Sequence, residues 1–88
     1  MVRDNMEAAK QLIQRARLDA NTIAMLHVIL NDVWKLVERR FEGHPARIRV
    51  PITIANALLN LTAAGERDPA ALGSNALTRA LALLKPTQ

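Results

Sequence analysis

Two arginines stand out among the residues that could do chemistry, because they alternate with apolar residues in the segment Ala46-Arg47-Ile48-Arg49-Val50. In an extended chain successive side chains face opposite ways, so both guanidinium groups would share one face. Each guanidinium can donate two hydrogen bonds to a guanine edge or to a phosphate. A lone strand this short needs a pairing partner. The segment therefore predicts either a strand at 46–50 that pairs with its own copy across a dimer, or a basic loop between helices.

The rest of the charge pattern also favours an anionic partner. The chain has a net charge of +4, and residues 43–88 carry five basic side chains against two acidic ones. Arg67 belongs to this excess and lies in a turn between two predicted helices. Together with Arg47 and Arg49 it is a candidate for binding nucleic acid or another anion.

Residues for catalysis or metal binding do not gather in any recognisable pattern. His27 and His44 fall in different elements, and neither is accompanied by carboxylates at metal-ligand spacing. Ser74 is the only serine, and no base is near it in sequence to activate it. Cysteine is absent, and the three glycines are scattered. We therefore expect no enzymatic activity, no metal and no cofactor.

The composition indicates one small, mainly α-helical domain. Half of the 88 residues are hydrophobic, but only Trp34 and Phe41 are aromatic, so the core must be built from aliphatic side chains. This composition is typical of packed helices. No apolar run approaches the roughly 18 residues of a membrane span, and cysteine is absent, so we expect a cytoplasmic protein without a membrane partner.

The first half of the chain, residues 1–42, is predicted to form a helical hairpin. Apolar residues at helical spacing predict one helix over residues 4–17 and a longer one from residue 20 or 22 to residue 41. Gly43 then ends the helical pattern. Residues 43–50 form the basic linker or strand.

The second half, residues 51–86, predicts another hairpin. Pro51 suits the first turn of a helix that Gly65 would cap at its end. Asp68 followed by a proline is a start signal for the last helix, which could alternatively begin near Ser74. The predicted architecture is thus two helical hairpins, four helices in all.

The long helix of the first hairpin is apolar around most of its girth. Such a stripe is wider than one neighbouring helix can cover, which favours burial against a second subunit. We expect a homodimer or a larger symmetric oligomer. The predicted interface residues are Leu26, Leu30, Val33, Trp34, Val37 and Phe41.

The segment from residue 47 to residue 84 resembles the ribbon-helix-helix family of DNA-binding proteins. The resemblance is carried by Arg47-Ile48-Arg49-Val50-Pro51, by the turn Glu66-Arg67-Asp68, and by apolar residues at helical spacing, namely Ile54, Leu58, Leu61, Leu72, Ala76, Leu77 and Leu81. It implies that Arg47 and Arg49 read bases and that amides near residues 68–71 approach phosphate.

Three functions follow as expectations. The first is a small dimeric DNA-binding regulator that uses Arg47 and Arg49. The second is a non-enzymatic adaptor or inhibitor that binds a protein partner, with the arginines meeting an acidic surface. The third is a helical assembly that binds an anionic, nucleotide-like ligand between subunits, at the two arginines or at Arg67.

Overall fold

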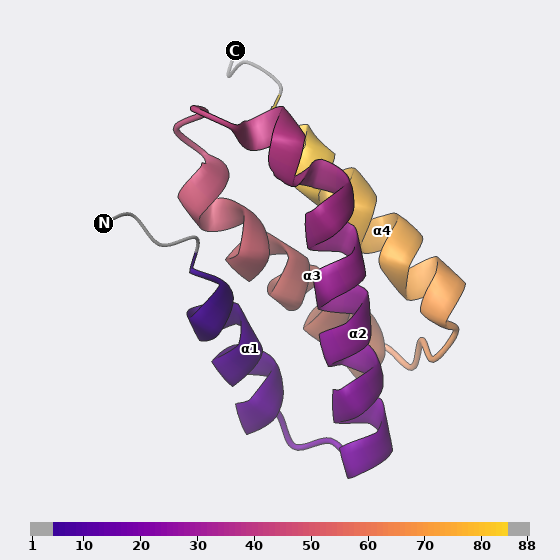
Figure 1. Cartoon of the computed structure of the whole chain (residues 1–88). Helices are drawn as coiled ribbons and strands as arrows, with labels where there is room; N and C mark the ends of the chain where they lie inside the picture. The colour runs from indigo at the N-terminus through magenta and orange to yellow at the C-terminus, as the bar shows by residue number, and fades with distance from the viewer. Residues whose placement is uncertain (1–4, 85–88) are drawn as a thin grey trace.

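The structure, a computed structural model, describes residues 5–84, and regular secondary structure in this range is entirely helical (Figure 1). Four α-helices are joined by short turns, and two short 3-10 helices lie in the connection between the second and the third. In chain order the elements are α1 (Met6–Arg15), α2 (Ala20–Val37), η1 (Glu38–Phe41), η2 (Arg47–Arg49), α3 (Val50–Ala63) and α4 (Pro69–Ala82). The predicted fold class, mainly α with four helices, is confirmed.

The helices pack around α2 and α3, each of which contacts the other three α-helices. In Figure 1, α2 and α4 run side by side in the same direction, while α1 lies on the opposite side of α2. The predicted start of the first helix at Asp4 and the predicted end of the second hairpin at residues 85–86 lie outside the described residues.

Local capping interactions fix where the helices begin. The Asp19 carboxylate accepts hydrogen bonds from the amide of Thr22 (3.1 Å) and from its hydroxyl (2.7 Å), which caps the start of α2. Asp68 accepts from the amide of Ala70 (3.2 Å), with Pro69 as the first residue of α4. The start signal at Asp68 was therefore correct, and the alternative start near Ser74 was wrong.

A glycine in a left-handed conformation ends α3. Gly65 has φ 104°, a region that a side chain disfavours. Its amide bonds to the carbonyl of Thr62, and the amide of Glu66 bonds back to the carbonyl of Leu61 (2.9 Å). This pair of bonds is a Schellman cap, and it confirms the predicted helix end at Gly65.

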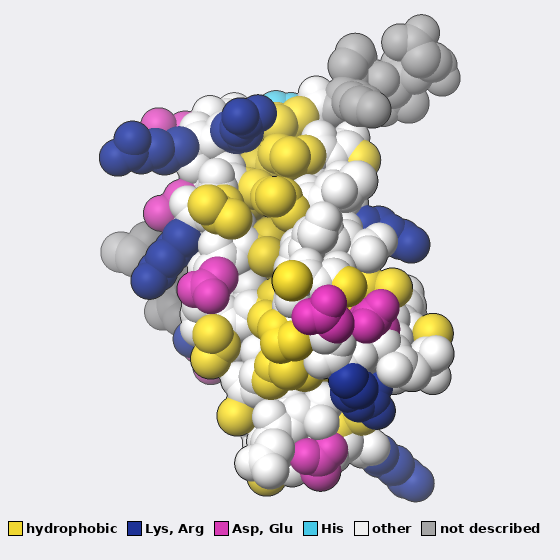
Figure 2. Space-filling model, turned by 90° about the vertical axis from the view of Figure 1, so that its right-hand side faces the viewer, with side chains coloured by type: hydrophobic (Ala, Val, Ile, Leu, Met, Phe, Trp, Pro, Cys, Tyr) yellow, Lys and Arg dark blue, Asp and Glu magenta, His cyan; other side chains and the backbone are white. Residues whose placement is uncertain are grey.

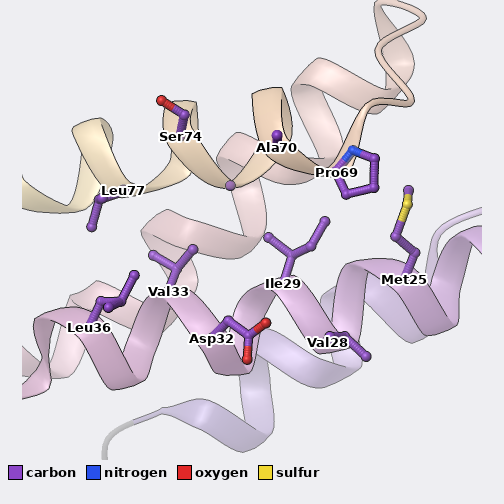
Figure 3. Close-up of a pocket in the computed structure, with 11 residues that line it drawn as sticks. Met25, Val28, Ile29, Asp32, Val33, Leu36, Pro69, Ala70, Ser74 and Leu77 are labelled. Carbon is purple, nitrogen blue, oxygen red and sulfur yellow. The ribbon is translucent and has the colours of Figure 1, made fainter.

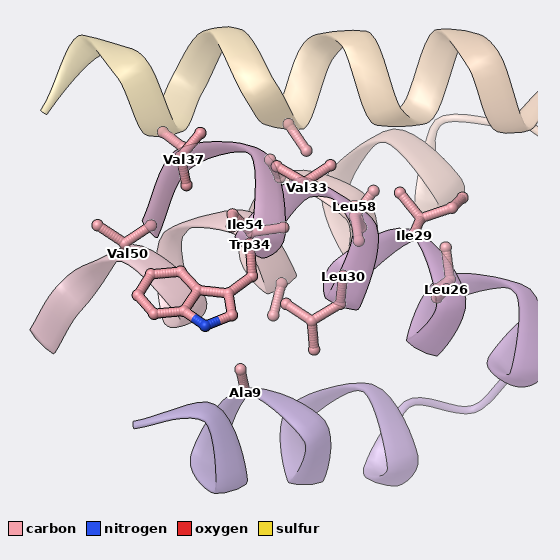
Figure 4. Close-up of a cluster of buried hydrophobic side chains, with 14 of the residues drawn as sticks. Ala9, Leu26, Ile29, Leu30, Val33, Trp34, Val37, Val50, Ile54 and Leu58 are labelled. Carbon is pink, nitrogen blue, oxygen red and sulfur yellow. The ribbon is translucent and has the colours of Figure 1, made fainter. Parts of the chain in front are cut away.

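The six residues predicted as an oligomer interface lie in the core of a single chain. Leu26, Leu30, Val33, Trp34, Val37 and Phe41 are all buried, with at most 8 % of any residue exposed. Figure 4 shows five of them packed with Ala9 of α1 and with Val50, Ile54 and Leu58 of α3. The apolar stripe of α2 is wide because three helices of its own chain contact it, and these six residues are therefore covered within one chain and not left open for a second subunit. Oligomerisation itself stays a prediction.

Within the single chain, residues 47–49 form a short helix and not the strand that was one of the two alternatives for residues 46–50. Pairing of this segment across a dimer stays a prediction. Arg47–Arg49 form η2, held by hydrogen bonds from the Arg47 amide to the His44 carbonyl (3.0 Å) and from the Arg49 amide to the Ala46 carbonyl (2.9 Å). Ala46 and Val50 are buried while Ile48 is exposed. Burial thus recurs every four residues, as in a helix, and not every second residue, as in a strand.

Candidate functional site

Arg47 is held within the fold. Its Cζ atom lies 5.1 Å from the centre of the Trp34 ring, a cation–π arrangement, and its Nη1 donates a hydrogen bond to the carbonyl of Glu38 (3.1 Å). These contacts join η1, η2 and the end of α2. The side chain is half-buried, so Arg47 contributes to holding the fold together at this end of the molecule.

Arg67 has a similar structural role at the other end of α3. Its Nη1 donates to the carbonyls of Thr62 (2.7 Å) and Glu66 (3.0 Å) and so ties the side chain to the turn that ends α3. Arg49 precedes α3, and Arg67 follows it. Because α3 has 14 residues, its ends are roughly 20 Å apart at ~1.5 Å per residue. The three predicted arginines therefore do not converge on one site.

The α2–α3 connection instead gathers a different set of arginines. Arg39 and Arg40 in η1 and Arg49 in η2 are exposed, and the Arg47 bond to η1 holds the two 3-10 helices together. This end of the molecule, which we call the basic end (residues 38–49), carries four arginines against two glutamates. The sequence pattern did not single out Arg39 and Arg40, because both fall within the long helix that it predicts up to residue 41.

The remaining candidates for chemistry stay apart. The imidazole Nδ1 of His44 accepts a hydrogen bond from the Ala46 amide (3.0 Å), and its ring stacks edge-on against Phe41 at 5.3 Å. His27 lies on α2, and Ser74 is exposed on α4. Among residues 5–84 no three side chains of the metal-binding types lie close enough to hold an ion together.

An apolar groove suited to binding lies between α2 and α4, and we call it the α2–α4 groove. Its volume is about 660 Å³, within the range of natural ligand sites. Figure 2 shows its surface as a band of hydrophobic side chains running along the molecule. Its lining consists of Met25, Val28, Ile29, Asp32, Val33 and Leu36 from α2, and of Pro69, Ala70, Gly73, Ser74 and Leu77 from α4.

The walls of the α2–α4 groove include the two most exposed large apolar residues of the described chain. Val28 is 59 % exposed and Leu36 is 66 % exposed. In Figure 3 Leu36, Val33, Ile29 and Met25 point from α2 toward α4, and Leu77 points back toward α2. Sequence analysis placed the α2 residues in the apolar stripe of that helix but could not separate those covered by their own chain from those left open.

Comparison of the chain with protein families, with curated protein sequences and with solved structures found no match. Within residues 5–84 no helix combines the length and the hydrophobicity needed to cross a bilayer.

Proposed function

We propose that this protein is a non-enzymatic interaction module that binds a helical segment of a partner protein in the α2–α4 groove. The observation that carries the proposal is the exposure of Val28 and Leu36 beside a continuous apolar concavity. Scattered apolar residues are ordinary on a protein surface. Here they border one depression, and apolar patches of this kind mark interaction sites.

The groove favours a helix over an extended peptide as its occupant. Its walls are the side chains of two α-helices, whose backbone groups are already bonded within each helix. An extended peptide in this groove would lose water from its amides and carbonyls without finding backbone partners. A helical guest satisfies its own backbone and needs only an apolar face, which is the helix-in-groove mode of recognition.

The chemical character of the groove fits binding better than catalysis. Asp32 and Ser74 are the only polar side chains of its described lining, and in Figure 3 they point away from each other. A catalytic site needs a nucleophile or an acid–base pair with matched partners. An apolar lining with few polar groups is typical of recognition.

The test uses a phage-displayed library of helical peptides selected on the purified protein. Selected peptides should bind the wild-type chain, and Leu36→Glu should weaken them at least about tenfold, because a carboxylate would then lie in the apolar contact. The matched control is Ile48→Glu, since Ile48 is also an exposed apolar residue, at 44 %, but lies outside the groove. Equal losses in both variants, or in neither, would contradict the proposal.

Duplex DNA is the second candidate partner, and the basic end favours it. Arg39, Arg40 and Arg49 are exposed at one end of the molecule, where they could contact successive phosphates. Replacing all three with alanine should abolish binding to a random duplex at low salt, and wild-type binding should weaken steeply as salt rises. Arg79→Ala is the control, because this exposed arginine lies on α4. A protein without affinity for any duplex at low salt would exclude this candidate.

A further inference from the structure

One charged side chain, that of Asp32, lines the α2–α4 groove, and it lies at the outer edge of the α2 wall (Figure 3). Asp32 follows Val28 by four residues and precedes Leu36 by four, so the three form one exposed ridge along α2 (Figure 3). The other ten lining residues are uncharged. We infer that the groove takes one amphipathic helix of a second protein whose apolar face carries a lysine or arginine opposite Asp32. This inference rests on the proposed function.

The need for a cation follows from what the guest does to Asp32. This carboxylate is exposed in the free protein, and water solvates it. A helix seated against Val28 and Leu36 would remove part of that water, because the carboxylate lies between them. A carboxylate that loses water without gaining a partner opposes binding. A guanidinium or ammonium group at the matching position of the guest restores the lost interactions and fixes the register of the helix in the groove.

The same charge argues against a second copy of this chain as the guest. The most exposed apolar ridge that a copy could offer is its own Val28–Asp32–Leu36 ridge. A two-fold axis through the middle of this ridge would bring Asp32 against the Asp32 of the copy, and like charges at such a contact are destabilising. The groove has no basic lining residue to relieve that repulsion. A heterologous helix with a basic residue avoids it.

The length of the groove sets the length of the guest. From Met25 to Leu36 the α2 wall spans 11 residue steps, or roughly 17 Å at ~1.5 Å per step. That length accepts about three turns of a guest helix, with apolar residues three or four positions apart and the basic residue near the centre.

The experiment selects phage-displayed helical peptides of about 16 residues, enough to cover the ~17 Å wall, in parallel against the wild-type chain and against Asp32→Lys. Wild-type selection should enrich peptides with a central Lys or Arg on an apolar face, whereas Asp32→Lys should enrich Glu or Asp at that position. A synthetic wild-type-selected peptide should lose about tenfold in affinity on Asp32→Lys and recover when its own basic residue becomes Glu. Glu7→Lys is the matched control, because it changes the net charge equally from an exposed position on α1.

The possible outcomes distinguish a failure of the inference from a failure of the proposed function. Peptides that depend on Leu36 but ignore the charge at position 32 would overturn the inference and leave the proposed function intact. If no selected peptide depends on Leu36, the proposed function fails. Sedimentation experiments could also show a concentration-dependent dimer that Leu36→Glu abolishes. That result would mean that a second copy of the chain occupies the groove, and it would overturn the inference.

Discussion

Gly73→Ala should stabilise the protein, because neither the backbone nor the packing requires glycine at this position. Gly73 lies inside α4, and unlike Gly43 and Gly65 it does not have a positive φ. An added Cβ would lie 3.7 Å from Cγ2 of Ile29, an ordinary van der Waals contact. Glycine in a helix interior is less favourable than alanine by about 1 kcal/mol. We expect the free energy of unfolding to rise by about that amount.

The assay is thermal and urea-induced unfolding followed by circular dichroism. For a domain of this size, about 1 kcal/mol corresponds to a rise in Tm of roughly 4–8 °C. Gly65→Ala is the control, because the left-handed φ of 104° at that position should make the same substitution destabilising. A loss of stability in Gly73→Ala would refute the reasoning and show that α2 and α4 pack too closely to admit a methyl group.

Three further predictions concern the fold. Thr62→Val should raise the free energy of unfolding by about 1 kcal/mol in urea titration, because the Thr62 hydroxyl is buried without a partner; Thr78→Val, at an exposed threonine, should change it little. Leu30→Ala should cost about 2–5 kcal/mol in the same assay and leave the sedimentation of the folded fraction unchanged, whereas Leu36→Ala should cost far less because Leu36 is mostly exposed. Hydrogen bonds from the Thr22 hydroxyl and amide lower the pKa of Asp19 below its ordinary value of 3.8. The stabilisation by Asp19 is therefore present above that ordinary value and lost as the pH falls through the folded pKa, so the deficit of Asp19→Ala in urea unfolding should stay constant above about pH 5 and shrink as the pH falls below 3.8.

The helices and their ends could be predicted from the sequence because they depend on local chemistry. Asp68 and the proline after it indicate the start of α4, and Gly65 indicates the end of α3. Both signals act through hydrogen bonds between residues a few positions apart. The strand at residues 46–50 was the exception. Its alternating pattern was equally compatible with Ala46 and Val50 four residues apart on a buried helical face, and tertiary packing decided between the two.

The candidate site was harder to predict because its residues become distinct only after the chain has folded. Leu30 and Leu36 belong to the same apolar stripe of α2, yet one is fully buried and the other mostly exposed. The difference depends on where the other helices lie around α2, and their positions follow from contacts between residues far apart in sequence. The arginines show the same limit. The sequence shows that Arg67 is charged, but only the fold shows that its Nη1 donates to the carbonyls of Thr62 and Glu66 at the end of α3.

The proposed binding of a helix would favour other residues in the α2–α4 groove than folding alone does. Folding alone would place alanine at position 73 and polar side chains at positions 28 and 36, since glycine weakens a helix and exposed apolar groups invite aggregation. The chain instead has a glycine, a valine and a leucine there, all lining one groove. Each of these residue types is common at such a position when it occurs alone. Together with Asp32, the one charged residue of that lining, they match what the proposed helix would require, because the small residue leaves depth, the apolar residues provide contact area and the carboxylate would set the register.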